Sequence, residues 1–257
     1  MFKKQKFPII EFDSDRNAVI SPHAFWPKIP GFPKHGVICF LGEAIHKLKA
    51  AGRLKEIYTV RSVCTDYPVY QVTYKGNKVA IFNPHIGAAA AGGILEEVAA
   101  RGCSKWISCG SAGVLDSKIA VGHLIIPRSA IRDEGFSYHY LKPAREVAAS
   151  PRAVKAIKAT LDKHGVPYLV SKTWTTDGFF RETPAKIALR KKEGCLAVEM
   201  EAAAIFAVAK FRGYHAGTII YGCDDVSGKD WDRRRAHDRA YIREKILWLA
   251  VEACLAI

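Results

Sequence analysis

The chain of 257 residues has no hydrophobic run of the roughly 18 residues that a membrane-spanning helix needs. Its basic first six residues are not followed by the apolar stretch of a secretory signal, so we expect a cytoplasmic protein without a membrane partner. None of the seven cysteines forms a C-x-x-C pair, and most lie inside apolar runs. This arrangement indicates buried free thiols and argues against a metal site.

Acidic residues are also scarce, at 25 against 39 lysines and arginines, which gives a formal net charge of +14. Such a charge could attract nucleic acid or small anionic substrates. The basic residues are scattered, apart from the N-terminal lysines and Arg233, Arg234 and Arg235. No aromatic side chains are interleaved with them as a base-stacking surface requires. We therefore expect no specific binding of nucleic acid.

The composition, 49% hydrophobic and 25% charged, is that of a globular protein and excludes wholesale disorder and a fibrous fold. Residues 1–35 contain five prolines that interrupt any helix, so we expect an irregular N-terminal segment. No repeat or Pro/Ser-rich linker follows. Length and texture predict a single domain over residues 1–257.

From Gly36 onward, apolar runs bounded by turn residues predict buried strands at residues 37–41, 79–83, 106–109, 123–127, 168–171 and 217–222. Helical patterns lie between them, at residues 43–51, 88–100, 150–164, 184–192, 198–211 and 233–255. Alternating strands and helices predict an α/β fold, a three-layer αβα sandwich with a mostly parallel sheet. Residues 69–74 followed by Lys75-Gly76-Asn77 look like a hairpin, so the sheet should be mixed.

Ligands of such sheets bind beyond the carboxyl ends of the strands. This rule selects the residues at 42–43, 84–87, 110–111, 175–181 and 223–225. One of these places is the turn Gly110-Ser111-Ala112-Gly113, whose small residues let backbone N–H groups approach an anion or a planar ring. The turn lacks the lysine of a Walker loop and the spacing of a dinucleotide fingerprint, so neither ATP nor NAD is indicated.

Two carboxylates, Glu199 and Glu201, stand at the start of the predicted helix over residues 198–211, which is apolar on all sides. Buried carboxylates need partners. At 100° per residue of helix they point about 200° apart, and we expect that they cannot share one site. Binding of a polyol and capping of the helix dipole are both consistent with the residues.

Asp224 and Asp225 follow the apolar run at residues 217–222. Adjacent carboxylates can raise each other's pKa, which prepares one of them as a general acid. A polar loop that caps a helix is the alternative. Neither a catalytic triad nor a spaced pair of metal-ligating histidines is present in the sequence.

Together, these positions resemble the nucleoside phosphorylase family of the uridine phosphorylase and hexameric purine nucleoside phosphorylase type, from about His23 to the C-terminus. The most specific piece is Val-Glu-Met-Glu-Ala-Ala at residues 198–203, which looks like the ribose-binding segment of the family. Four weaker pieces also match in the order that the family has. They are Asn-Pro-His-Ile-Gly at 83–87, the Gly-Ser-Ala-Gly turn at 110–113, Arg-Asp-Glu-Gly at 132–135, and Asp224.

The resemblance implies a pentosyltransferase of nucleoside salvage. Such an enzyme cleaves the N-glycosidic bond of a nucleoside with phosphate, gives the free base and ribose 1-phosphate, and needs no cofactor. Carried over by position, Met200 and Glu201 would hold the ribose beside Glu199, with Glu201 accepting its 2′ and 3′ hydroxyls. Phe179 would pack on the nucleoside, and His23 would reach the sugar of a neighbouring subunit. A homo-oligomer follows, either a dimer or a hexamer built as a trimer of dimers.

For the base, the resemblance favours a purine. Asp224 matches the acid that protonates N7 of the leaving purine in purine-specific members. Uridine-specific members recognise uracil with a Gln-x-Arg pair, which residues 179–183 lack, although Arg181 could serve a related role.

The phosphate site departs from the family pattern. Gly42 begins the loop that reads Gly-Asp-Pro-x-Arg in the family and Gly-Glu-Ala-Ile-His here, and Ser108 replaces the arginine before the Gly-Ser turn. Arg61 matches the arginine that is donated across a dimer, and Ser111 keeps its hydroxyl. Related nucleosidases lack the two missing arginines and use water, and Glu43 could then be their first-loop glutamate. A non-catalytic nucleoside-binding relative is the second alternative.

Overall fold

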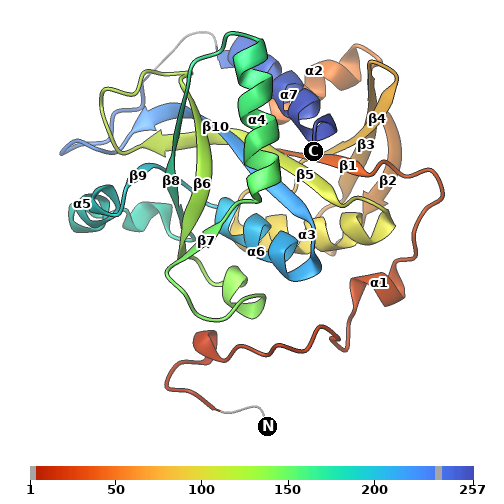
Figure 1. The fold of residues 1–257 in the computed structure, drawn as a ribbon, viewed down its shortest axis with the longest axis horizontal. Helices are drawn as coiled ribbons and strands as arrows, with labels where there is room; N and C mark the ends of the chain where they lie inside the picture. The colour runs from red at the N-terminus through yellow and green to blue at the C-terminus, as the bar shows by residue number, and fades with distance from the viewer. Residues whose placement is uncertain (1–3, 235–238) are drawn as a thin grey trace.

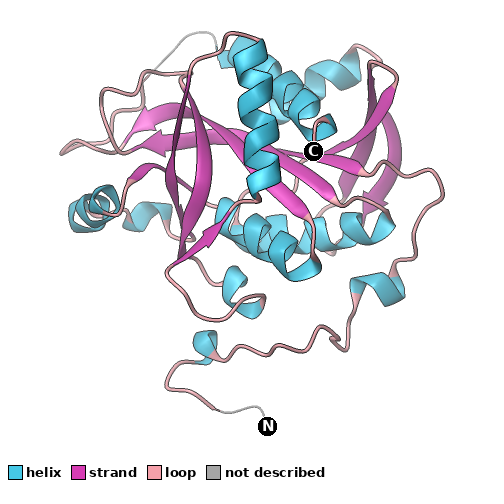
Figure 2. Ribbon diagram, viewed as in Figure 1, coloured by secondary structure: helices cyan, strands magenta, loops and turns pink. Residues whose placement is uncertain are grey.

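The centre of the molecule is a ten-stranded mixed β-sheet in a computed structural model that describes residues 4–234 and 239–257 (Figures 1 and 2). Its strands are β1 (His35–Cys39), β2 (Lys55–Val60), β3 (Tyr67–Tyr74), β4 (Asn77–Phe82), β5 (Lys105–Val114), β6 (Leu124–Asp133), β7 (Glu146–Ala148), β8 (Tyr168–Thr176), β9 (Cys195–Glu199) and β10 (His215–Asp225). The α-helices are α1 (Pro22–Phe25), α2 (Gly42–Ala50), α3 (Ala88–Arg101), α4 (Pro151–Lys163), α5 (Pro184–Lys192), α6 (Ala202–Arg212) and α7 (Arg239–Leu255).

The sheet is mixed, as predicted. Its two longest ladders, β5 with β10 and β6 with β8, are parallel, and β1 is parallel to both β4 and β5. The hairpin of β3 and β4 is confirmed, with Tyr74 opposite Asn77. Its two turn residues, Lys75 and Gly76, both have positive φ angles, which is the geometry of the tight turns that match strand twist.

One half of the sheet closes on itself. β5 pairs with β10, β10 with β6, β6 with β8, β8 with β9, and β9 returns to β5. Gly222 lies opposite Ala112 and Val198 lies opposite Gly113, so the ends of β9 and β10 meet the Gly-Ser-Ala-Gly segment of β5. This closure brings three of the segments selected from the sequence to one place.

Helices cover both faces of the sheet, which confirms the three layers. Figure 1 shows α2, α4 and α7 on one side and α3 and α6 on the other. The first group buries Leu48, Ile157 and Leu247 against the sheet, and the second buries Leu95 and Phe206. Residues 202–209 of α6 are all buried, as its apolar sequence predicted.

Several element boundaries differ from the predictions. Residues 4–34 are irregular except for a 3₁₀ turn, η1 (Pro8–Ile10), and α1, where Pro22 begins a helical turn instead of preventing one. Helix α7 begins at Arg239, whereas the predicted helix over 233–255 includes residues 235–238, which lie outside the described part of the chain. β2, β7 and β9 were not predicted. No helix within the described residues is long and apolar enough to cross a membrane.

Candidate functional site

Two adjoining cavities open where β5, β9 and β10 meet. The small cavity measures about 180 Å³ and is lined by Phe40, Ile86, Ser108, Cys109, Gly110, Ser111, Glu199, Met200, Glu201, Ala202, Thr218 and Ile220. The large cavity measures about 630 Å³ and includes Gly113, Phe179, Phe180, Glu182, Pro184, Ile187, Val198, Asp224, Val226, Lys229 and Trp231 in its wall. Ser111, Glu199 and Met200 line both. The two cavities therefore form one bipartite site.

The two glutamates of the Val-Glu-Met-Glu segment share the small cavity. The prediction that Glu199 and Glu201 cannot share one site is wrong, because it assumed that both lie on a helix. Glu199 instead ends β9, and α6 begins only at Ala202. The 100° step per residue does not apply across a strand end.

Glu199 is held by four hydrogen-bond donors. Its Oε2 accepts from the backbone N–H groups of Glu201 at 2.8 Å and Ala202 at 2.6 Å. Its Oε1 accepts from the hydroxyls of Thr175 at 2.6 Å and Thr173 at 3.4 Å. Burial raises the pKa of Glu199, and the four donors act against that shift. The helix-capping role that the sequence left open is filled by this residue.

Glu201 is nearly buried and has fewer partners. Its Oε1 accepts from the N–H of Gly87 at 2.7 Å, and its Oε2 from the N–H of Met200 at 3.3 Å. Burial and the neighbouring Glu199 raise the pKa of Glu201 to about 8. Gly87 has a φ of 114°, a conformation that other residues rarely adopt. The loop at residues 83–87 thus supplies both a wall, through Ile86, and a donor.

The place of the missing phosphate arginine is occupied by hydroxyls. Ser108 Oγ lies 2.6 Å from Thr218 Oγ1, and both residues line the small cavity with Ser111. Among residues 4–234 and 239–257, no lysine, arginine or histidine lines this cavity. Gly42, at the start of α2, does not line this cavity either. It packs closely against Asn83, since a Cβ added at Gly42 would lie 3.3 Å from the Asn83 side chain.

Glu43, the candidate first-loop glutamate of a nucleosidase, lines neither cavity. Its Oε2 forms an ion pair of 2.7 Å with Arg243 of α7, and its Oε1 lies 4.0 Å from Lys47. The structure therefore places this carboxylate among cations on the side of α2 and α7, away from Glu201.

The large cavity has a mainly apolar wall. Phe179 and Phe180 come from a 3₁₀ turn, η3 (Phe179–Arg181), and Pro184 and Ile187 come from α5. Phe179 is half exposed at this wall, where a planar ring would contact it. Arg181 is exposed and lines neither cavity.

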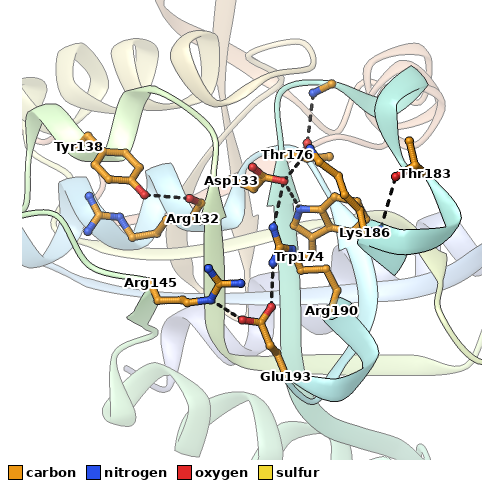
Figure 3. Close-up of polar contacts among 11 residues, drawn as sticks. Arg132, Asp133, Tyr138, Arg145, Trp174, Thr176, Thr183, Lys186, Arg190 and Glu193 are labelled. Carbon is orange, nitrogen blue, oxygen red and sulfur yellow. Dashed lines mark hydrogen bonds and ion pairs between the residues drawn. The ribbon is translucent and has the colours of Figure 1, made fainter. Parts of the chain in front are cut away.

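A polar cluster beneath α5 fixes this wall in place (Figure 3). Asp133 Oδ2 accepts from the indole N–H of Trp174 at 2.9 Å and from Lys186 and Arg190 of α5, each at 3.3 Å. Arg132 is buried and donates to Ser137 at 2.8 Å. The Arg-Asp-Glu-Gly motif at 132–135 therefore supports the site from behind.

Asp224 and Glu182 are two of the carboxyl groups that line the large cavity. Asp224 Oδ2 accepts from the indole N–H of Trp231 at 2.7 Å. Glu182, to which the sequence analysis assigns no role, lines the same wall. Burial and the charge of Asp224 raise the pKa of Glu182 to about 7. Charge patterning could have identified this residue, since it is an acid between two aromatic residues and a helix start.

Asp225 points away from the cavity, as alternation along a strand requires. It forms an ion pair of 2.8 Å with Arg234 and accepts from the N–H of Ser227 at 2.8 Å. Although burial alone would raise the pKa of Asp225, the hydrogen bond from Ser227 and the charge of Arg234 lower it. The carboxyl partner of Asp224 is therefore Glu182 instead of Asp225. Arg234, of the basic cluster at 233–235, thus compensates the charge of Asp225, and Arg235 lies outside the described residues.

His23 and Arg61 lie away from both cavities of their own chain. His23 is on α1, with its Nε2 3.1 Å from the hydroxyl of Tyr214. Arg61 follows β2 and is exposed. The chain therefore brings together Ser111, Met200, Glu201, Phe179 and Asp224 and leaves His23, Gly42, Arg61 and Arg181 outside.

Comparison with known proteins accords with this geometry. The family profile described as "Phosphorylase superfamily" matches residues 34–255. The chain belongs to the phosphorylase superfamily. A DeoD-type purine nucleoside phosphorylase from Colwellia psychrerythraea is 28% identical over 190 residues, 72% of this chain and 80% of that protein. A guanosine phosphorylase from Halorubrum lacusprofundi is 26% identical over 60% of this chain, and the match spans only 64% of that protein.

Solved structures share the fold of this superfamily member. A purine nucleoside phosphorylase from Toxoplasma gondii, in complex with immucillin-H, superposes with a TM-score of 0.74 at 18% identity, over 86% of this chain and 90% of that chain. A uridine phosphorylase from Vibrio fischeri superposes with a TM-score of 0.70 at 23% identity, over 90% and 96%. A purine and a uridine phosphorylase thus share the fold of this chain.

Proposed function

We propose that the protein is a nucleoside phosphorylase that cleaves the N-glycosidic bond of a purine nucleoside with phosphate, giving the free base and ribose 1-phosphate. The bipartite site carries this proposal. Its small polar part adjoins a larger apolar part, and Ser111, Glu199 and Met200 form the boundary. A nucleoside has this same division, with a polar sugar joined to a planar base.

The sugar fits the small cavity. Glu201 is placed there by Gly87 and Met200, and its carboxylate would accept hydrogen bonds from two vicinal hydroxyls of ribose. Glu199 holds the start of α6 so that the segment between β9 and α6 keeps its shape. A bound ribose would bring two hydroxyl donors to Glu201 and so favour its charged form, which makes these hydrogen bonds charge-assisted.

The base fits the large cavity. Phe179 and Phe180 offer ring faces for stacking, and Asp224 and Glu182 offer a proton for a leaving purine. Arg181 does not line the cavity, so the recognition of uracil by an arginine has no counterpart in this wall. These features support a purine over uridine as substrate.

Phosphate is the proposed acceptor, with Ser111, Gly42 and Arg61 as its binding groups. Ser111 lies in the site, and Arg61 would have to come from a neighbouring subunit. Water is the second candidate acceptor. One observation favours it: the small cavity contains no cation among the residues that the structure describes. Two missing arginines remove charge-assisted bonds of about 1.5–3 kcal/mol each.

Incubation with inosine, adenosine and uridine, each with and without phosphate, tests the acceptor. We expect base release that depends on phosphate and yields ribose 1-phosphate, detected by chromatography of both products. Base release at the same rate without phosphate would replace the phosphorylase by a nucleosidase. A protein that binds nucleosides and cleaves none would be the non-catalytic relative.

We also propose a homo-oligomer, either a dimer or a hexamer built as a trimer of dimers, because Arg61 and His23 could reach a sugar or a phosphate only from a neighbouring chain. Light scattering should give a multiple of the 28.4 kDa chain. Arg61→Ala should then weaken phosphate use without changing the mass. A monomer at working concentration would remove both residues from the site.

A further inference from the structure

Asp224 and Glu182, both in the wall of the large cavity, have different surroundings. Asp224 accepts a hydrogen bond from the indole of Trp231 at 2.7 Å. The Glu182 carboxyl accepts no hydrogen bond and forms no ion pair with any residue in 4–234 or 239–257, and its wall is the aromatic and aliphatic surface of η3 and α5. Asp224 thus has a hydrogen-bond donor, whereas the apolar wall around Glu182 favours the neutral form of that carboxyl.

The charges around Asp224 and Glu182 also favour a proton on Glu182. Lys229 and Asp230, which also line the cavity, are exposed and of opposite sign, and Glu199 adds negative charge on the sugar side. No lysine or arginine of the described residues forms an ion pair with Asp224 or Glu182. Lys229 is exposed and pairs with neither Glu182 nor Asp224, so the two carboxylates repel each other and one of them takes up a proton. That one is Glu182, and its pKa of about 7 agrees.

We propose that Glu182 carries the proton that leaves with the base, and that the charged Asp224 keeps Glu182 protonated at neutral pH. This inference rests on the proposed cleavage of a purine nucleoside and reassigns its acid. The bond from C1′ to N9 breaks, its electron pair stays on the base, and the Glu182 proton moves to N7. The acceptor, hydrogen phosphate or water, forms the new C1′–O bond and releases a proton that restores Glu182. Asp224 then acts as a positioning residue.

The pH dependence of kcat/KM for inosine separates the two acids. A general acid works only while protonated, so activity of the natural protein should fall as the pH rises through about 7. Glu182→Gln should lower turnover by roughly 10²–10⁴-fold at every pH, because the amide has no acidic proton. Asp224→Asn should lose up to about 10-fold at neutral pH and recover at lower pH, since Glu182 keeps the effect of burial on its pKa and loses only the added effect of the Asp224 charge.

A substrate that needs no acid provides the matched control. In 7-methylinosine the ring already carries a positive charge, so the base leaves without a proton. Glu182→Gln should cleave it at nearly the natural rate, which also shows that the variant folds and binds the sugar. Glu244→Gln, on α7 and in neither cavity, should leave both substrates and the pH profile unchanged.

The mirror result would overturn the proposal. If kcat/KM of Asp224→Asn is low at every pH, and Glu182→Gln only shifts the pH at which kcat/KM falls, then Asp224 is the proton donor. Equal losses on inosine and 7-methylinosine for Glu182→Gln would make its role structural. If the natural protein cleaves neither substrate, the proposed function itself fails, and that outcome differs from a failure of Glu182 alone.

Discussion

Glu201→Ala should lower kcat/KM for a nucleoside by roughly 10²–10⁴-fold, the loss of two charge-assisted hydrogen bonds of about 1.5–3 kcal/mol each. Glu201 is the one acid of the small cavity whose oxygens are not already committed to four donors, since it accepts only from Gly87 and Met200. Steady-state kinetics with inosine or guanosine measure the effect. The same comparison can be made with a nucleoside that lacks the 2′ hydroxyl and with one that lacks both the 2′ and 3′ hydroxyls. The fold-loss of kcat/KM caused by Glu201→Ala should become smaller with each hydroxyl removed.

Glu43→Ala provides the control for this prediction, because Glu43 is paired with Arg243 and lines neither cavity. It should change kcat/KM by less than about 3-fold, as surface ion pairs contribute little. A large loss in Glu43→Ala together with a small one in Glu201→Ala would place the ribose elsewhere. It would also revive the first-loop glutamate of a nucleosidase.

Glu201 should also limit the stability of the folded protein. The folded chain keeps the proton of Glu201 up to about pH 8, whereas an unfolded glutamate loses it near its ordinary value of 4.5. The unfolded state therefore binds fewer protons between these values, and Glu201 destabilises the fold increasingly as the pH rises from 4.5 to 8. Glu201→Gln should accordingly melt at a higher temperature than the natural protein at pH 8, with little difference near pH 4, although it is a poor enzyme.

Periodic apolar patterns predicted the parts of the fold that are buried on both faces. Helix α5 was placed at its observed bounds, and β1, β4, β5 and β10 were found from their apolar cores. The unpredicted strands are short or polar. β2 reads Lys-Glu-Ile-Tyr-Thr-Val at the edge of the sheet, and β7 has only three residues. Edge strands pair through their backbone, and this pairing leaves little trace in hydrophobicity.

Only those site residues that lie in sequence motifs of the family could be predicted from the sequence. Met200, Glu201, Phe179 and Asp224 were found through a resemblance, and the cavities contain them. Glu182 was missed because its partner, Asp224, lies 42 residues away and the two meet only through the closed half of the sheet.

A second reason for the misses is that the segment between β9 and α6 reads as continuous helix. Alanine, methionine and glutamate all favour helices, so propensity extends α6 back to Val198. The pairing of Val198 with Gly113 and of Glu199 with Thr175 instead keeps these residues in β9. Tertiary pairing outweighs a local preference of a few tenths of a kcal/mol per residue.

Glu199→Ala should be the most destabilising single change in the site. It leaves the N–H groups of Glu201 and Ala202 and the hydroxyl of Thr175 without their acceptor, all of them buried. At about 1–3 kcal/mol for each of the three unpaired donors, the loss should be roughly 3–9 kcal/mol. In a chain of this length that corresponds to a fall in Tm of roughly 10 °C or more. Thermal and urea unfolding measure it.

Glu199→Gln separates hydrogen bonding from charge at the same position. Its carbonyl can still accept from the two backbone N–H groups, and its amide can face Thr175 and Thr173, whose hydroxyls rotate to accept. We therefore expect a loss of only about 1 kcal/mol, close to one ordinary hydrogen bond. Glu146→Ala, which removes a carboxylate paired with Lys172 at the surface, should cost less than about 1 kcal/mol. If Glu199→Gln is as unstable as Glu199→Ala, the negative charge at the start of α6 matters more than the four donors, and the macrodipole is the dominant interaction.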